Sequence, residues 1–476
     1  MDFCSECLES KDEELIDTAT RTLAIMKNRP EDEDQDKKVD IPSAGRRRTV
    51  VLQNISKPDW LSCAAVTWSF LDGRSFEELS EKVDFDLEIL LDAMKEQKTR
   101  MKDGVEWTLS CILMLLHTPA TGLPVILPKL PQMSDVLLGS IKDSPDVAER
   151  ACGVIYYLAH GYSCSETTSL SALEPYLSDI VTSLTAAAER NDANLSCAAY
   201  ETLQEVVRCS DPVKSLEATA PVLRFFLNKF AKTLRLPIDS TRKLDLLAKI
   251  CGGMQVTIEK LSGSNDGKHV ISEVADKIMT LLPKVFIYKI RSATVLEKAM
   301  LAIGALARAT GPEFRKYMQE FYQHLETGLD NMEENKVCSA SVEVASDICR
   351  ALGYRVLPFC SDLVPVLFRN LCSRKLHRSA KPLIYSCFGD IALAIGIYFE
   401  EHVLWVMRMM RDAADECAQR IDREYGEQLK RSVLKAYFAI LQGCKRSKPE
   451  ILEPHAPQIL KFVEVVVKDA NNRYVF

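Results

Sequence analysis

The sequence predicts an all-α fold, a superhelical solenoid built from antiparallel helix pairs. Three observations predict it. Apolar residues recur at spacings of three and four along most of the chain, which is the period of a helix with one buried face. An Ala-rich helix follows a tight turn roughly every 40 to 50 residues, the period of HEAT and armadillo repeats. The chain, at 476 residues, is also longer than one hydrophobic core usually serves, whereas stacked helix pairs share a continuous core.

The second helix of each pair is the clearer one, because small residues alternate with large apolar ones and let a neighbouring helix approach. Residues 377–396, HRSAKPLIYSCFGDIALAIG, show this best. Pro382 is expected to kink this helix or to mark its first turn. Asp390 is a candidate functional group, although a solvated or capping carboxylate is the commoner role for a single Asp. Second helices are expected to begin near Pro58, Lys102, Pro145, Asn194, Arg242, Ser292, Lys336, His377 and Glu427.

The first helices fill the intervals between these segments, and several carry aromatic residues near their starts. They are expected to begin near Phe85, Pro175, Phe314 and Leu357, and residues 451–468 would be the first helix of a further pair. Longer loops are expected near residues 160–171, 262–267 and 411–423. The pair Gly252-Gly253 lies inside a helical pattern and predicts either close helix packing or a kink. Residues 47–476 are thus expected to form about nine to ten repeats in one continuous solenoid without β-sheet.

Residues 1–46 differ in composition from the rest. Residues 4–26 could form a helix, an acidic run (EDEDQDKK) follows Pro30, and three arginines follow at 46–48. A charge run of this kind is most often a solvated linker. The alternative is an acidic loop that contacts a basic ligand.

Composition restricts the function. The formal net charge is −7 and the pI about 5.7, which disfavours nucleic acid as the main partner and permits a basic one. The 16 cysteines include one C-x-x-C, Cys4 to Cys7, with no second pair, so free thiols in a reducing compartment are expected. The sequence shows neither a signal peptide nor an apolar run of about 18 residues. We therefore expect an intracellular protein that does not insert into a membrane.

No motif for catalysis is present. We find neither a Gly-rich phosphate loop, nor G-x-S-x-G, nor H-E-x-x-H, and the seven histidines lack metal-ligand spacing. We expect no catalytic residues, metal or cofactor, and no enzymatic activity. The remaining signal is acidic, because each predicted second helix carries carboxylates. These acids are Glu106, Glu149, Glu201, Glu205, Asp245, Glu297, Glu343, Asp347 and Asp390.

Two of these acids have an aromatic neighbour in the sequence, Glu106 beside Trp107 and Glu201 beside Tyr200. Second helices line the concave wall of such a solenoid, and acids beside an aromatic ring suit Lys or Arg side chains through charge and cation–π contact. An equally plain interpretation is that these acids form the solvated side of each helix.

Long runs of the sequence resemble the importin β (karyopherin β) family. They are NISKPDW (54–60), VEWTLSCI (105–112), AAYETLQEVVRCS (198–210), EKAMLAIGALARATGPEFRKYM (297–318), DICRALGYRVLPFC (347–360) and HRSAKPLIYSCFGDIALAIG (377–396). The resemblance covers about residues 50 to 470, and VDIPSAG after the acidic run also matches. It implies a receptor for nuclear import that binds the basic helix of the adaptor importin α or a basic cargo protein. It further implies binding to FG-repeat nucleoporins, release of cargo by RanGTP, and location in cytoplasm, nucleus and nuclear pore.

By resemblance and by pattern together, ten residues are expected to hold the basic helix. They are Glu31, Asp32, Glu33, Asp34, Asp36, Glu106, Trp107, Glu149, Glu201 and Glu205. Compared with the family, repeats are missing at both ends. One Trp of the family is absent, with Asp40 at about its position, and a second Trp is replaced near Gly153. These departures imply weaker binding of the adaptor and of nucleoporins, and impaired RanGTP control. The alternatives are a HEAT scaffold outside transport and a degenerate copy that binds nothing well.

Overall fold

The computed structural model describes residues 126–164, 173–235, 241–288, 292–418, 423–444 and 449–471, with isolated positions at 109, 112, 113 and 116. The chain divides into two compact units, Met1–Ser210 and Asp211–Phe476. Every regular element in the described ranges is a helix. The predictions for residues 1–46 and for helices near Pro58, Phe85 and Lys102 lie outside the described residues.

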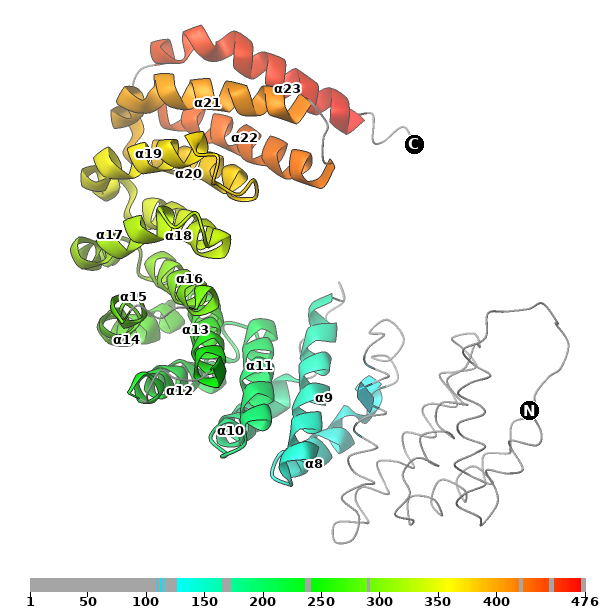
Figure 1. The fold of residues 1–476 in the computed structure, drawn as a ribbon. Helices are drawn as coiled ribbons and strands as arrows, with labels where there is room; N and C mark the ends of the chain where they lie inside the picture. The colour runs from blue at the N-terminus through cyan, green and yellow to red at the C-terminus, as the bar shows by residue number, and fades with distance from the viewer. Residues whose placement is uncertain are drawn as a thin grey trace, which may run out of the picture. The chain divides into compact units, whose positions relative to one another are not determined.

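The described part of unit 1 contains two helix pairs (Figure 1). A short η1 (Leu127–Lys129) leads into α8 (Leu130–Ser140), which pairs with α9 (Pro145–Cys164). After η3 (Glu174–Tyr176), α10 (Leu177–Ala188) pairs with α11 (Ala193–Cys209). The two second helices, α9 and α11, pack along each other. This side-by-side packing places residues about 50 apart in the sequence in direct contact.

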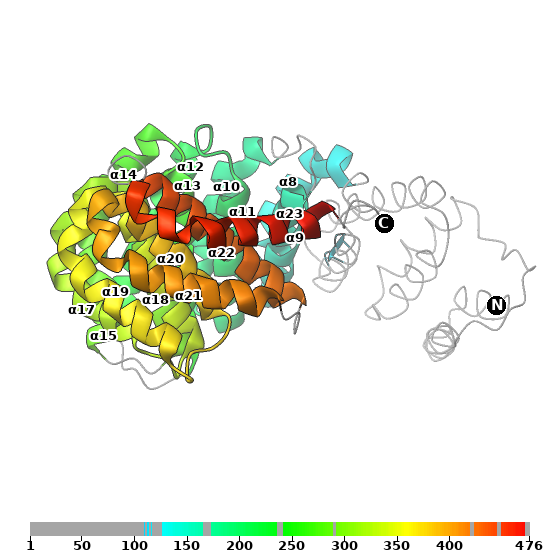
Figure 2. The same ribbon diagram turned by 90° about the horizontal axis from the view of Figure 1, so that it is seen from above.

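Unit 2 repeats the same plan. Its second helices are α13 (Thr241–Leu261), α16 (Ala293–Thr310), α18 (Asn335–Leu352), α20 (Ala380–Ile395) and α22 (Arg423–Cys444). Its first helices are α12 (Leu216–Leu234), α14 (Asn265–Leu281) with the short α15 (Lys284–Ile287), α17 (Arg315–Leu329), α19 (Leu357–Cys372) and α21 (Glu400–Ala418). After α22, the short turns η7 (Pro449–Ile451) and η8 (Glu453–His455) lead into α23 (Ala456–Asn471). Each second helix packs on the next, so α13 to α22 form one continuous row. The helices α12, α14, α17 and α19 form a second row behind it (Figures 1 and 2).

The predicted all-α solenoid of HEAT type is confirmed, and the seven predicted second helices in the described ranges begin within four residues of the observed starts. Side-chain caps at the turns explain this accuracy. The Asp192 carboxylate accepts a hydrogen bond from the Leu195 amide at 2.9 Å at the start of α11, and the Ser292 hydroxyl accepts one from the Val295 amide at 3.4 Å at the start of α16. Pro382 lies in the first turn of α20, as expected.

Three predicted loops are wrong in extent. Helix α21 continues to Ala418, so residues 411–418 are helical. Helix α14 begins at Asn265, which leaves a three-residue turn after α13, and α9 continues to Cys164. In each place a run of polar residues suggested a loop, but these residues either cap a helix or cover its exposed side.

Three glycines in the left-handed region form the corners between repeats. Gly311, Gly353 and Gly396 each have φ of 56° and follow a second helix directly. Each opens a four-residue 3-10 turn, namely η4 (Gly311–Phe314), η5 (Gly353–Val356) and η6 (Gly396–Phe399), after which the next first helix begins. The last residue of every turn is buried. The corner therefore reverses the chain and anchors it in the core within four residues, with a backbone conformation that only glycine adopts easily.

Two helical stretches, residues 335–372 and 380–417, are long and apolar enough to cross a membrane by length and composition alone. Each contains one of the corner glycines and divides there into a second helix and the following first helix. Their apolar sides pack against neighbouring helices of unit 2. We therefore assign both stretches to the solenoid core.

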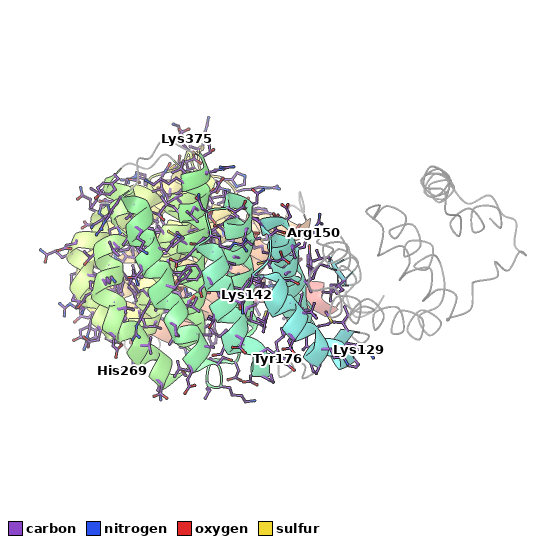
Figure 3. All side chains as sticks on the ribbon, turned by 90° about the horizontal axis from the view of Figure 1, so that it is seen from below. Lys129, Lys142, Arg150, Tyr176, His269 and Lys375 are labelled. Atoms are coloured by element: carbon purple, nitrogen blue, oxygen red, sulfur yellow. The ribbon has the colours of Figure 1, made fainter. Side chains whose placement is uncertain are left out.

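Glycines of second helices also let neighbouring helices come into close contact. A Cβ added at Gly253 in α13 would lie within 2.7 Å of three carbon atoms of the Phe226 ring in α12. The sequence prediction of close packing at this site is confirmed. Charged side chains such as Lys142 and His269 lie on the outside of their units (Figure 3). The core thus follows the apolar faces of the helix pairs.

Candidate partner-binding site

Three of the ten predicted site residues lie in the described part of the chain: Glu149 on α9, and Glu201 and Glu205 on α11. The acidic run at 31–36 and the pair Glu106-Trp107 lie outside the described residues. The site can therefore be built at the contact of α9 and α11, both in unit 1.

A buried hydrogen bond sets the register of these two helices. The Thr202 hydroxyl of α11 donates to the Cys152 carbonyl of α9 at 3.0 Å. Burial of the Cys152 side chain, with a contribution from the charge of Glu149, raises the pKa of its thiol to about 12. Cys152 is therefore a packing residue, and Glu149, one turn before it, remains on the surface.

The Glu205 side chain is buried and bound by neighbouring side chains of α9 and α11. Its side chain is only 3% exposed, and its carboxylate accepts hydrogen bonds from His160 Nδ1 at 3.1 Å and from the Arg208 guanidinium. The Cys209 thiol lies 3.7 Å from the same carboxylate. Glu205 therefore joins α9 to α11 below the surface, with its charge balanced by Arg208, whereas Glu149 and Glu201 are exposed.

An aromatic surface lies beside these acids. The Tyr156 ring stacks on the His160 ring, with centroids 5.9 Å apart and planes 9° apart, and meets the Tyr157 ring edge-on at 5.3 Å. Burial, together with the carboxylates of Glu205 and Glu201, raises the pKa of Tyr156. A tyrosine ring next to carboxylates can accept a guanidinium or ammonium group through cation–π contact and charge.

Sequence reasoning chose the wrong aromatic residue in this repeat. Tyr200, expected beside Glu201 at the surface, is fully buried. Tyr156 and His160 were missed, although their spacing of four residues on a helix places them on one side of α9. We define the α9–α11 acidic surface as Glu149, Tyr156, Glu201 and Glu205.

Several acids predicted on second helices of unit 2 have internal partners, as Glu205 has in unit 1. Asp347 and Asp390 form ion pairs with arginines of the same chain, and Glu297 lies 3.4 Å from Lys298. Asp245 and Glu343 are exposed. The deepest carboxylates of this row are therefore already neutralised by internal partners. Within the described ranges, no group of three His, Cys, Asp or Glu residues could hold a metal ion.

Comparison with known proteins identifies the family to which this architecture belongs. A family model described as "Importin subunit beta-1-like, TPR repeats" matches residues 132–475. The chain belongs to this importin β family. It is 42% identical over 431 residues to importin subunit beta-1 of Arabidopsis thaliana, covering 87% of this chain and 49% of that protein. Importin subunit beta-1 of Schizosaccharomyces pombe is 27% identical over 438 residues, covering 88% and 49%.

Solved structures show the same fold. A crystal structure of importin β matches with a TM-score of 0.73 at 24% identity, over 96% of this chain and 58% of that one. A Kap95:Nup1 complex also has a TM-score of 0.73, at 22% identity, over 98% and 57%. A structure of Kap95p with RanGDP matches with a TM-score of 0.70 at 20% identity, over 99% and 61%. The chain spans about half the length of the curated importin β relatives.

The resemblance seen in the sequence is therefore confirmed. Membership of the importin β family also supports the expectation that the chain is not an enzyme.

Proposed function

We propose that the chain works as a nuclear transport receptor of importin-β type, which binds the basic importin-β-binding helix of importin α or a basic cargo protein. Family membership supports this function, and the α9–α11 acidic surface is the observation that carries it. Two exposed carboxylates and a tyrosine ring would each receive a Lys or Arg side chain of the partner. Glu205 would act from beneath the surface and hold α9 and α11 in place.

The seven predicted site residues outside the described ranges belong to the same proposal. Glu31, Asp32, Glu33, Asp34 and Asp36 would bind the basic helix as an acidic loop, with Glu106 and Trp107 on the repeat before α9. Trp107 would add an indole face, the strongest cation–π surface among the side chains.

The decisive experiment is a titration with a fluorescein-labelled basic importin-β-binding peptide at 50 and 150 mM salt. We expect submicromolar binding that weakens with salt, because exposed charges are screened. Glu149→Gln and Glu201→Gln should each weaken binding by a factor of about 1.4 to 5, since one exposed ion pair contributes about 0.2 to 1 kcal/mol. Asp179→Asn on the first helix α10 is the control, because it removes an exposed carboxylate from the other layer of unit 1. Undetectable binding at 50 mM salt would reject the receptor function and leave a HEAT scaffold or a degenerate copy.

RanGTP and FG-repeat nucleoporins are the further partners that we propose, with weaker nucleoporin binding than in longer relatives and location in cytoplasm, nucleus and nuclear pore. Relatives were solved with Nup1 and with Ran. In this chain Leu404 and Trp405 of α21 are exposed, and the Trp405 ring lies 5.7 Å from the Phe368 ring of α19. This apolar surface would suit a Phe side chain. A pull-down on immobilised FG repeats with Trp405→Ala tests nucleoporin binding, and addition of RanGTP to the peptide complex tests release.

A further inference from the structure

A chain of five charged side chains crosses four neighbouring second helices of unit 2. Arg308 of α16 donates from Nη2 to Glu259 Oε1 of α13 at 2.6 Å, and from Nη1 to Asp347 of α18. Arg350 of α18 donates to Asp347 Oδ1 at 2.7 Å and to Asp390 Oδ2 of α20 at 3.1 Å. We call this Glu259–Arg308–Asp347–Arg350–Asp390 series the inner ladder. Each link joins groups that come from adjacent repeats, except the bond within α18.

Asp347 is the centre of the inner ladder. Its side chain is 6% exposed and receives both arginines, one on each carboxylate oxygen. Gly304 of α16 makes room for it, because a Cβ at that position would lie 2.8 Å from Asp347 Oδ2 and 2.9 Å from Val344 Cγ2. A buried carboxylate that lost its cations would be strongly unfavourable. The geometry therefore fixes α16 against α18 at this level.

The row of first helices has no such continuous series among the residues that the structure describes. Arg224 of α12 pairs with Glu273 of α14 at 2.9 Å, Lys316 of α17 pairs with Asp276 of α14 at 2.6 Å, and Arg369 of α19 pairs with Asp330 after α17 at 2.6 Å. All six side chains are at least 43% exposed, and no residue is shared between two of these pairs. Isolated exposed pairs contribute about 0 to 1 kcal/mol. In the described ranges of unit 2, ion pairs therefore connect the second helices in a continuous series and the first helices only as separate, exposed pairs.

We propose that the inner ladder is a curvature clamp, which holds the second helices of unit 2 together and loosens when ionic strength rises. The curvature of a solenoid is the sum of small rotations between repeats. A rotation that separates α16 from α18, or α18 from α20, must stretch a link of the inner ladder, whereas separation of first helices stretches only isolated pairs. The two arginines are 40% and 54% exposed, so salt reaches the cationic ends while the central carboxylate stays buried.

The proposal is tested by hydrogen–deuterium exchange and small-angle X-ray scattering on the full chain, in 50 mM and 1 M KCl. In the wild type, 1 M KCl should increase exchange in residues 344–352 of α18 about tenfold and increase the radius of gyration. Arg308→Gln should show both changes already at 50 mM KCl and should respond less than the wild type to added salt, because the two links made by Arg308 are gone and only the two made by Arg350 remain. Arg224→Gln is the matched control, since it breaks an ion pair between adjacent repeats in the other row.

Two results would overturn the clamp. One is an Arg308→Gln profile that matches Arg224→Gln, and the other is a wild-type profile that salt does not change. If Arg308→Gln loses helicity in its far-UV circular dichroism spectrum, Asp390→Asn carries the test, because it removes only the last link and keeps the side-chain volume. We expect Asp390→Asn to increase exchange in α20 at 50 mM KCl, and equality with Arg224→Gln would again reject the clamp.

Discussion

Gly253→Ala offers a direct test of how α12 and α13 pack. The new methyl carbon would lie within 2.7 Å of three carbons of the Phe226 ring, whereas carbon atoms pack at about 3.5 to 4.0 Å. Phe226 is fully buried, so its ring has little room to move away. Ala in place of Gly in a helix interior gains about 0.5 to 1 kcal/mol, and overpacking costs about 1 to 3 kcal/mol. We expect a net loss of about 1 to 2 kcal/mol in the free energy of unfolding.

The same Gly→Ala change at Gly426 should raise the free energy of unfolding instead of lowering it. This residue lies in the first turns of α22, and a Cβ there would meet nothing within 4 Å, so Gly426→Ala should stabilise by about 0.5 to 1 kcal/mol. Urea unfolding followed by far-UV circular dichroism measures both variants against wild type. Phe226→Leu removes the ring edge and should make Gly253→Ala less costly in the double variant than alone. A Gly253→Ala protein as stable as wild type would refute the packing argument.

Three further predictions concern unit 2. Gly353→Ala should lower the free energy of unfolding by about 1 to 3 kcal/mol, measured by urea unfolding, because its φ of 56° strains any residue with a Cβ. Glu343 is exposed only in part, and desolvation of its carboxyl group together with the nearby charge of Asp347 raises its pKa above the unfolded value, so this group opposes folding at neutral pH, where both states are ionised. Glu343→Gln should therefore raise the melting temperature at pH 7, and the gain should disappear as pH falls through the raised pKa to below about 4.3. Cys372 is exposed and should be alkylated by iodoacetamide at pH 8 well before Cys360, whose pKa burial raises to about 12, as peptide mass spectrometry would show.

The sequence was sufficient for the helices and their order, because the second helices share a 3.6-residue apolar period and some also have a polar cap at their start. The Asp192 and Ser292 caps, for example, lie within two residues of the predicted starts of α11 and α16. The loop near residue 411 was mispredicted because a polar helix surface and a polar loop have the same composition. The corner glycines were also missed, although Gly311, Gly353 and Gly396 recur 42 and 43 residues apart.

The candidate site was harder to predict than the fold. The partial exposure of Tyr156 and the burial of Tyr200 depend on how α9 and α11 rotate against their neighbours, which local periodicity does not determine. The ion pairs of Asp347 and Asp390 were predictable in principle. Their arginines lie 39 and 40 residues earlier in the sequence, about one repeat, so partners at the repeat spacing should be sought before an acid on a second helix is assigned to a ligand.

The corner glycines have a mechanical consequence for unit 2. Because the connections that follow α16, α18 and α20 each close in four residues and end on a buried side chain, they contain no slack. When the two ends of such an array are pulled, the connections cannot lengthen, and the extension must come from rotation of one helix pair against the next. At small forces unit 2 should therefore respond as an elastic spring with a restoring force, and not as a string of beads on loose linkers. Gly353→Ala would change the stiffness of one coil of that spring without altering the surfaces that contact a partner.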